Sequence, residues 1–235
     1  MTAQDLIAKL DGHTDPQRAI SSARYFKSGP GQYGEGDKFI GLTMPLIRAL
    51  SKPFRKMPLD ELEKVIQSPI HEHRMSALII LADTYKSRDQ YGKKESFELY
   101  CRALKEGGVN NWDLVDVTAP HVVGEYAYEN EPELLYKLAH SENLWEKRTA
   151  ILSTFAYIKR GIAEHTYAIA EILLHDKHDL MHKAVGWLLR EMGKRVDEKM
   201  LIQFLDLHCK DMPRTMLRYS LERLTPDVRS YYMKK

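Results

Sequence analysis

The amino-acid sequence predicts an all-α fold in which helical pairs stack as a HEAT-like helical-repeat solenoid, an α-α superhelix. Apolar residues recur at intervals of three and four in nearly every segment, as they do on one face of a helix. Runs that alternate apolar and polar residues, which are typical of strands, are scarce. Similar segments also return about every 34 to 40 residues, a spacing typical of helical-pair repeats. Such repeats line a concave surface with one set of helices, and we expect a groove there.

Three segments show the apolar stripe of a helix most clearly. The stripes consist of Met75, Leu78, Ile79 and Ala82, of Ile151, Leu152, Phe155 and Ile158, and of Val185, Leu188, Leu189 and Met192. Residues typical of helix ends lie between such stripes. The expected N-caps are Ser141 and Asp179, the expected helix stop is Gly161, and the prolines expected in first turns are Pro45, Pro132 and Pro213.

The repeat can be followed along the chain by the starts of its equivalent helices. These are expected near Ile70, Asn110, Leu144, Asp179 and Pro213. Four of the segments that follow share an early basic residue and then a dense apolar stripe. No linker rich in Pro, Gly or Ser divides the chain, so we expect a single domain over residues 1–235.

The composition indicates a cytoplasmic globular protein. The chain has 235 residues, 43% of them hydrophobic, which is enough for a sizeable core. No stretch approaches the roughly 20 apolar residues of a membrane span, and the first ten residues do not resemble a signal peptide. The two cysteines, Cys101 and Cys209, are too few for a disulfide framework, and we expect both to be packing residues.

The charge of the chain is distributed unevenly. The net formal charge is only +2, but residues 144–235 carry 17 Lys and Arg against 12 Asp and Glu. Residues 1–143 carry 18 against 21. The relatively basic C-terminal part suits a polyanionic partner such as nucleic acid, although solvated helix faces produce similar imbalances.

A glycine-rich segment at residues 27–38 interrupts the helical pattern. Its four glycines and one proline predict a loop between helices. A phosphate-binding loop is one interpretation, but the segment lacks the Lys-Ser/Thr ending of a P-loop and follows no convincing strand. A loop that faces a nucleic acid, or one that only connects two helices, is the alternative.

The three tryptophans each have a charged residue at helical spacing. Trp112 and Asp116 are four residues apart and share a helix face, whereas Asp113 points elsewhere and suits the helix N-terminus. Arg148 follows Trp145 by one turn, and Arg190 follows Trp187 by one turn. A core tryptophan beside a solvated charge is the simpler interpretation of any one pair. Its recurrence on successive equivalent helices favours a shared functional face.

These residues resemble the AlkD-type DNA alkylation repair glycosylases, which are built from HEAT-like repeats. The resemblance extends over nearly the whole chain. It is carried by residues 23–25, 39–45, 112–116, 145–150 and 184–190, of which the last three segments are the specific ones. It implies that the concave groove binds DNA.

The resemblance also implies the catalytic residues. Asp116 corresponds to the catalytic aspartate, and Trp112 and Trp187 correspond to the aromatic pair that flanks the lesion nucleotide. A purine alkylated at N3 or N7 is already cationic, so its departure needs no general acid. A carboxylate can stabilise the positive sugar and position water, and tryptophan rings attract cations. These residue types therefore suit this chemistry.

Further residues are expected to contact the DNA backbone. Arg148 and Arg190 correspond to phosphate-binding arginines, whose fixed donor fork matches a phosphate. Tyr25 matches a tyrosine near the DNA. We also expect DNA contacts from Thr43, within the segment 39–45, and from Lys183, directly before the segment 184–190.

The function implied is that of a monofunctional alkylpurine DNA N-glycosylase. It would hydrolyse the N-glycosidic bond of cationic N3- and N7-alkylated purines in duplex DNA, without base flipping, as a monomer and without a metal or other cofactor. No lysine occupies a matching catalytic position for a Schiff-base lyase, so an abasic site is the expected product.

Two departures from the family leave the preferred lesion open. The glycine-rich loop before Phe39 is longer than in the best-known members, and Asn111 stands where some members have a second tryptophan. Two other functions stay in view, namely a non-catalytic HEAT-like protein that binds damaged or branched DNA and a helical scaffold that binds proteins.

The remaining clusters of polar residues have structural interpretations. Two groups invite a metal interpretation, namely His71 and His73 with Glu72, and His175, His178 and His182. However, His178 and His182 are only an i, i+4 pair without an obvious third ligand, and surface histidines are common at helix starts. The glutamate groups at residues 61–63 and 129–133 suggest paired-carboxylate hydrolysis. Solvated helix ends explain them more simply.

Overall fold

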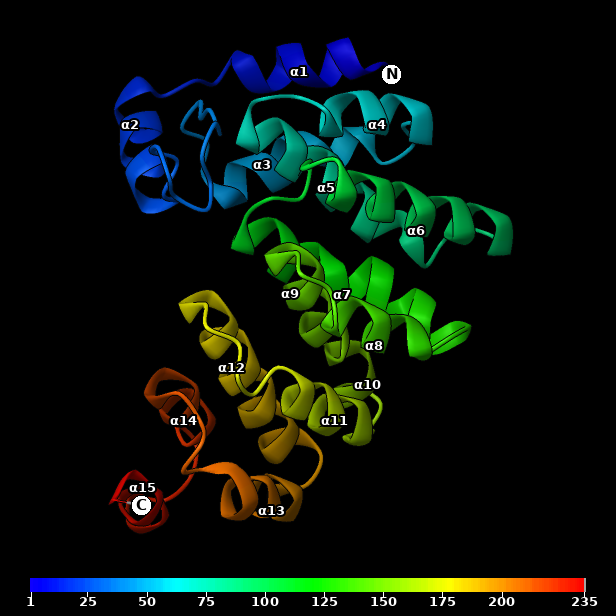
Figure 1. Cartoon of the computed structure of the whole chain (residues 1–235). Helices are drawn as coiled ribbons and strands as arrows, with labels where there is room; N and C mark the ends of the chain where they lie inside the picture. The colour runs from blue at the N-terminus through cyan, green and yellow to red at the C-terminus, as the bar shows by residue number, and fades with distance from the viewer. Residues whose placement is uncertain (235) are drawn as a thin grey trace. The chain divides into compact units, whose positions relative to one another are not determined.

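The chain is all-α, as its sequence predicts (Figure 1). The structure is a computed structural model that describes residues 1–234, and within them the only extended pairing is an isolated parallel bridge between Lys38 and Ile70. None of the helices in this range is long and apolar enough to cross a membrane. Contacts divide the chain into two compact units, Met1–Val122 and Val123–Lys235. The single domain and the continuous superhelix stay predictions.

The first unit is built around helix α5. Its helices are α1 (Ala3–Asp11), α2 (Pro16–Tyr25), α3 (Met44–Ser51), the 3-10 helix η1 (Lys52–Phe54), α4 (Leu59–Ile66), α5 (His71–Tyr85), α6 (Gln90–Lys105) and the start of α7 (Trp112–Glu129). Helix α5 packs against α1, α3, α4 and α6. Thirteen of its 15 residues are buried, including the four polar residues of its first turn, so this turn is a polar part of the core.

The second unit is built around helix α12. Its helices are the end of α7, α8 (Glu133–Ala139), α9 (Leu144–Ser153), α10 (Phe155–Ile158), α11 (Glu164–Ile172), α12 (Asp179–Arg195), α13 (Glu198–His208), α14 (Arg214–Ser220) and α15 (Pro226–Lys234). Helix α12 packs against α9 and α14, which begin the preceding and following predicted repeats. Stacking of this kind is expected for helical-pair repeats.

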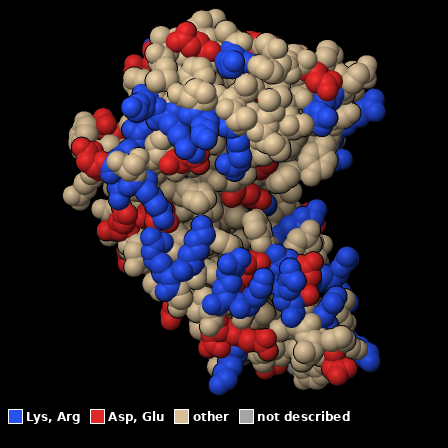
Figure 2. Space-filling view, turned by 180° about the vertical axis from the view of Figure 1, so that it is seen from behind, with Lys and Arg blue, Asp and Glu red and all other residues tan. Residues whose placement is uncertain are grey.

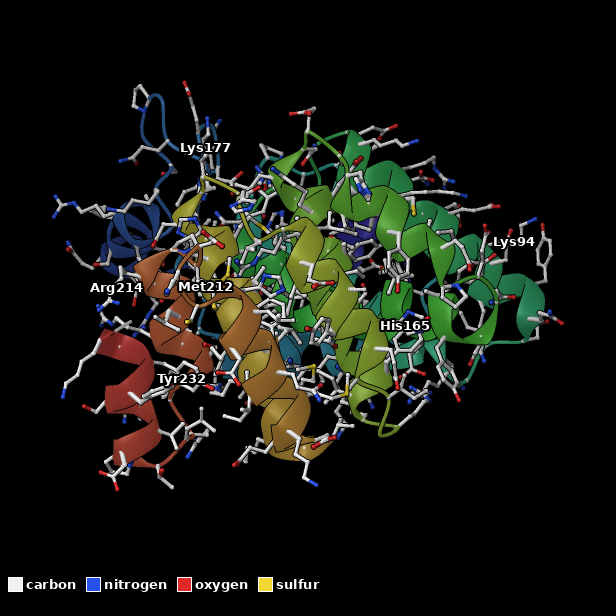
Figure 3. All side chains as sticks on the ribbon, turned by 60° about the horizontal axis from the view of Figure 1, so that its bottom comes forward. Lys94, His165, Lys177, Met212, Arg214 and Tyr232 are labelled. Carbon is white, nitrogen blue, oxygen red and sulfur yellow. The ribbon has the colours of Figure 1, made fainter. Side chains whose placement is uncertain are left out.

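Helix α15 is fastened to the second unit at two points. Tyr232 is only 3% exposed, and its hydroxyl donates to Asp206 on α13 across 2.9 Å. The Arg214 guanidinium donates to the backbone carbonyl of Met233. Figure 3 shows Tyr232 on α15 and Arg214 near that helix. The last helix is therefore a packed element.

The predicted helix starts are confirmed within one or two residues, but two of the predicted caps are wrong. Helix α9 is capped by the side chain of Asn143, which accepts from the N–H of Trp145, whereas Ser141 accepts from the N–H of Asn143. Helix α12 is capped by His178, and Asp179 is its first residue. The helix predicted through Ile158 ends at Ser153 and resumes as α10. Local propensity alone does not settle which of several polar neighbours caps a helix.

Candidate functional site

Trp112 belongs to an aromatic cluster in the first unit that is centred on Phe26. The ring of Phe26 stacks on Trp112 at a centroid distance of 5.5 Å and on Phe39 at 5.4 Å. Tyr25 meets Trp112 edge-on at 5.9 Å. Since Tyr25 is 64% exposed and Trp112 is partly exposed, the cluster has a face open to solvent. Stacked aromatic rings of this kind suit a planar base or a cation.

A mostly apolar cavity lies beside this cluster. Its volume is about 290 Å³, and its lining includes Phe26, Phe39, Met75 and Trp112. Three ionisable side chains, those of His71, Glu72 and Asp113, also line it. The cavity lies within the first unit. Phe26, Phe39 and Trp112 belong both to its lining and to the aromatic cluster.

A buried network of charged side chains supports the aromatic cluster. The imidazole of His71 contacts the carboxylate of Asp37 at 3.2 Å and that of Asp113 at 2.9 Å. Arg74 donates to Asp37 across 2.7 Å, and Asn110 donates to the same oxygen across 2.7 Å. The network joins the end of the glycine-rich loop, the first turn of α5 and the start of α7. Trp112 is thus held by residues on both sides of it in sequence.

The electrostatics of this network favour the charged forms. Burial lowers the pKa of His71, because it disfavours the charged imidazolium. The hydrogen bonds with Asp113 and Asp37 outweigh this effect and raise the pKa of His71 to about 9. Burial raises the pKa of the Asp37 carboxyl, but its hydrogen bond with His71 and the charge of Arg74 outweigh this, so that pKa lies below its usual value. His71 is therefore a cation at neutral pH.

Glu72 fixes the segment that carries Phe39. Its carboxylate accepts hydrogen bonds from the backbone N–H groups of Ile40, Gly41 and Leu42 at 2.8 to 3.3 Å. Gly41 has a φ of +83°, and a Cβ there would lie 2.2 Å from the carbonyl oxygen of Asp15. Only glycine suits this position. The segment is thereby held against α2 and α5, and Phe39 with it.

Asn111 has a structural role at the start of α7. Its side chain accepts from the N–H of Trp112 at 2.9 Å and donates to the carbonyl of Phe26. It is fully buried. Asn111 therefore binds the first N–H of α7 and ties this helix to the aromatic stack.

Asp116 lies one turn along α7 from Trp112, as its spacing predicts. It is partly exposed, whereas its neighbours Leu114 and Val115 are fully buried. Asp113, predicted to assist the helix N-terminus, accepts from the N–H of Leu114 and also contacts His71. The two carboxylates therefore differ in their surroundings. Asp113 belongs to the buried network, whereas Asp116 lies on the same face of helix α7 as Trp112.

In the second unit, Trp187 lies on α12 near the ring of Phe155, which makes cation–π contacts. It is partly exposed, and its ring centroid is 6.4 Å from that of Phe155. Lys159 and Arg195 lie over the Phe155 ring at 5.2 and 5.4 Å. Two cationic side chains thus lie over the ring next to Trp187. Figure 2 shows Lys and Arg side chains mixed with acidic ones on the face that it presents.

Three of the other predicted DNA-contacting residues, Arg148, Arg190 and Lys183, have partners of their own. Arg148 is only 4% exposed and donates to the carbonyl of Leu180. Arg190 forms ion pairs with Glu191 and Glu222. Lys183, with a side chain 42% exposed, pairs with Asp179. Thr43 is the N-cap residue of α3 and makes no capping hydrogen bond through its side chain. Their contact with phosphates stays a prediction.

The histidines considered as metal ligands make other contacts. His73 contacts Ser68 and Asp11, and His182 contacts the carbonyl of Asp176. His178 accepts from the N–H of Leu180 as the cap of α12. No group of three or more potential ligand side chains gathers within residues 1–234.

Sequence reasoning missed most of the support of the first-unit cluster. It singled out Trp112 and Tyr25 but not Phe26, which contacts both. It treated residues 27–38 as a loop that faces a nucleic acid or only connects two helices, and did not foresee that Asp37 joins His71 and Arg74. The position of Asp37 directly after four glycines was the one available signal, because such a loop can bring a side chain back into the core.

Comparisons with known proteins point to a single family. A family model for DNA alkylation repair enzymes matches residues 6–224. The chain also resembles a solved structure described as a predicted DNA alkylation repair enzyme from Enterococcus faecalis, with a TM-score of 0.69 and 17% sequence identity. This match covers 91% of the present chain and 97% of that one, and at such identity it shows the fold alone. Comparison with curated proteins gave no match.

Proposed function

Since the chain belongs to the DNA alkylation repair enzyme family, we propose that it is a monofunctional glycosylase that releases cationic N3- and N7-alkylated purines from duplex DNA. Membership of this family supports a role in DNA repair. The observation that carries the finer proposal is the partly exposed carboxylate of Asp116, one helical turn from the ring of Trp112 at the edge of an open aromatic cluster.

Asp116 is proposed to stabilise the transition state. When the bond between C1′ and the purine nitrogen breaks, its electron pair neutralises the positive charge of the alkylated base. Positive charge then develops on the sugar, where a nearby carboxylate stabilises it electrostatically. Water attacks C1′, and its proton passes to solvent through Asp116. The product is an abasic site, since no amine nucleophile is invoked.

The aromatic residues are proposed to select the lesion by its charge. Trp112, with Tyr25 beside it, offers ring faces that attract an alkylated purine cation and the polarised C–H groups of the sugar. Trp187 is proposed to act in the same way from the second unit. Because an open cluster can act on a nucleotide that stays in the duplex, we propose excision without base flipping, unlike the common glycosylase strategy.

The proposed function is tested by incubating the protein with duplex DNA methylated by a simple alkylating agent. Released 7-methylguanine and 3-methyladenine are separated from the DNA by chromatography. Asp116→Asn is expected to reduce release about 10²- to 10³-fold while leaving DNA affinity nearly unchanged. Asp211→Asn, at an exposed position in the second unit, is the matched control and should retain full release.

Two results would contradict the proposal. Release by Asp116→Asn at the rate of the unsubstituted protein would remove Asp116 from the reaction. If the unsubstituted protein binds methylated duplex with a steep salt dependence but releases no base, it is instead a non-catalytic DNA-binding protein.

A further inference from the structure

A pocket in the second unit gathers three arginines from three helices. It has a volume of about 400 Å³, and its lining includes Arg190 from α12, Arg218 from α14 and Arg229 from α15. Glu222 is the one acidic residue in the lining. Since arginine is always charged at physiological pH, the lining carries a net charge of +2. Such a pocket attracts anions.

The pocket is built by packed elements. Helices α12 and α14 approach closely at Gly186, where a Cβ would lie 2.4 Å from the carbonyl oxygen of Met216. Helix α15 is anchored by Tyr232 and by the contact of Arg214 with Met233, which also lines the pocket (Figure 3). The three arginines are therefore presented from a fixed framework.

The two carboxylate partners of Arg190 differ in how firmly they are held. The side chain of Glu191 is 8% exposed and also accepts from Nε of Arg195 across 2.6 Å. Burial raises the pKa of Glu191, but the hydrogen bonds from Arg195 and Arg190 outweigh it and keep that pKa below its usual value. The side chain of Glu222 is 55% exposed and reaches Arg190 from the solvent side. An exposed ion pair of this kind is weak.

Arg190 also has an unused donor. Its Nε is buried and donates to no acceptor among residues 1–234. Its Nη1 is occupied by Glu222, the weaker of its two partners. A phosphate has more acceptor oxygens than a carboxylate, so one phosphate can accept from several of the lining arginines at once. It is therefore a better partner than Glu222 for Arg190, Arg218 and Arg229 together.

We propose that Arg190, Arg218 and Arg229 form a pocket for a DNA backbone phosphate, in which the carboxylate of Glu222 stands in for the phosphate until DNA displaces it. The inference rests on the proposed function in that DNA is the partner. It adds Arg218 and Arg229 to the phosphate-binding residues and gives Glu222 a role opposed to binding.

The test is the affinity for an unmodified, fluorescein-labelled duplex of about two helical turns, followed by anisotropy at several salt concentrations. Arg218→Ala with Arg229→Ala is expected to weaken binding about tenfold at low salt and to reduce the salt slope by about one. Glu222→Gln is expected to strengthen binding about threefold, because a competing anion is removed. Misfolding cannot mimic a gain of affinity.

Arg223→Ala is the matched control, since Arg223 is exposed, adjacent to Glu222 in sequence and outside the lining of the pocket. It should leave the affinity nearly unchanged. Unchanged or weaker binding by Glu222→Gln would overturn the inference, as would an equal loss from Arg223→Ala and the double variant. A parallel titration with inorganic phosphate at constant ionic strength identifies the source of the anion. Tight binding of free phosphate without any change in DNA affinity would also overturn it.

These results are separable from those on base release. Affinity for unmodified duplex requires neither Asp116 nor an alkylated base. If no base is released but the variants change the affinity as expected, the phosphate pocket stands and the glycosylase proposal fails.

Discussion

The two units place similar residue types in opposite environments. In the first unit, Asp37, His71 and Arg74 form a network in which each of the three side chains is at most 5% exposed. In the second unit, Arg190 pairs with a glutamate whose side chain is 55% exposed. Both arrangements lie near a tryptophan that is expected to act on DNA. They differ in how easily a charged partner can be exchanged.

This difference in burial indicates that the two units have different roles. Removing one member of a buried charge network lowers the stability of the fold strongly. Such a network therefore fixes the position of the segments that it joins. In the first unit it supports the start of α7, with Trp112 and Asp116, where the proposed reaction needs preorganised geometry. An exposed pair exchanges its partner at little cost. In the second unit this suits the binding of phosphates.

The largest expected effect comes from Asp37→Ala. The substitution leaves the buried charges of Arg74 and His71 without their shared partner, and we expect it to lower the free energy of unfolding by about 3–5 kcal/mol. Urea denaturation, followed by the fluorescence of Trp112 in a background of Trp145→Phe and Trp187→Phe, measures it.

Glu131→Ala is the control for this substitution, because it breaks an exposed ion pair with Lys137. It should have almost no effect on stability. A loss below about 1 kcal/mol for Asp37→Ala would show that the buried network does not hold the first unit together.

The second effect is a dependence of stability on pH in the alkaline range. The pKa of His71 is about 9 in the folded chain and close to 6.5 when unfolded. Because the folded value is raised, the stabilisation is fully present below pH 6.5 and is lost as the pH rises through 9. The unfolding free energy should fall by up to about 3 kcal/mol across this window.

His71→Gln should remove most of this alkaline loss in the same urea measurement. His13→Gln, at an exposed position in the first unit, should preserve it. An identical loss in the protein and in His71→Gln would assign the titration to another group.

Gly186→Ala tests the close packing of the second unit. The added Cβ would lie 2.4 Å from a backbone carbonyl and 2.6 Å from Cβ of Tyr219, so α12 and α14 must separate. We expect a net loss of about 1–2 kcal/mol in unfolding free energy, because overpacking outweighs the better helix propensity of alanine.

Gly92→Ala is the comparison for this substitution, measured in the same denaturation experiment. Its closest new contact would be 3.1 Å from the side-chain oxygen of Asp89 that caps α6, a much smaller overlap than the two at Gly186. It should be neutral or stabilising. A stabilising Gly186→Ala would mean that the approach of α12 and α14 is not constrained as described.

The smallest expected effect on stability is that of Glu222→Gln. Since its ion pair with Arg190 is largely exposed, we expect a change below about 1 kcal/mol in unfolding free energy. Thermal denaturation followed by circular dichroism measures it. A loss as large as that of Asp37→Ala would erase the contrast between the two units.

The sequence predicted the helices well because each carries its own apolar periodicity. The starts expected near Ile70, Leu144, Asp179 and Pro213 lie within one residue of the observed helices. Caps were harder to predict, since Ser141 and Asn143 are both good capping residues and the choice depends on the path of the preceding turn.

The site was predicted only in its outermost residues. The spacing of Trp112 and Asp116 is local, and a helix converts it directly into a shared face. The network of Asp37, His71 and Asn110 joins residues more than 30 positions apart, and no periodicity encodes such contacts. The same holds for Arg190 and Glu222, which only the packing of α14 on α12 brings together.

The anchoring of residues 40–42 by Glu72 determines where the chain can change its length. The N–H of Asp15 donates to the carbonyl of Ile40, so both ends of the segment that contains α2 and the glycine-rich loop are held. Within it, Gly31 has no heavy atom within 4 Å of a built Cβ. Loop-closure entropy rises slowly, by only about 0.6 kcal/mol for each doubling of length. We therefore expect insertions and deletions at residues 30–32 to leave Phe39 in place, so that the loop can diverge in length while the aromatic stack is preserved.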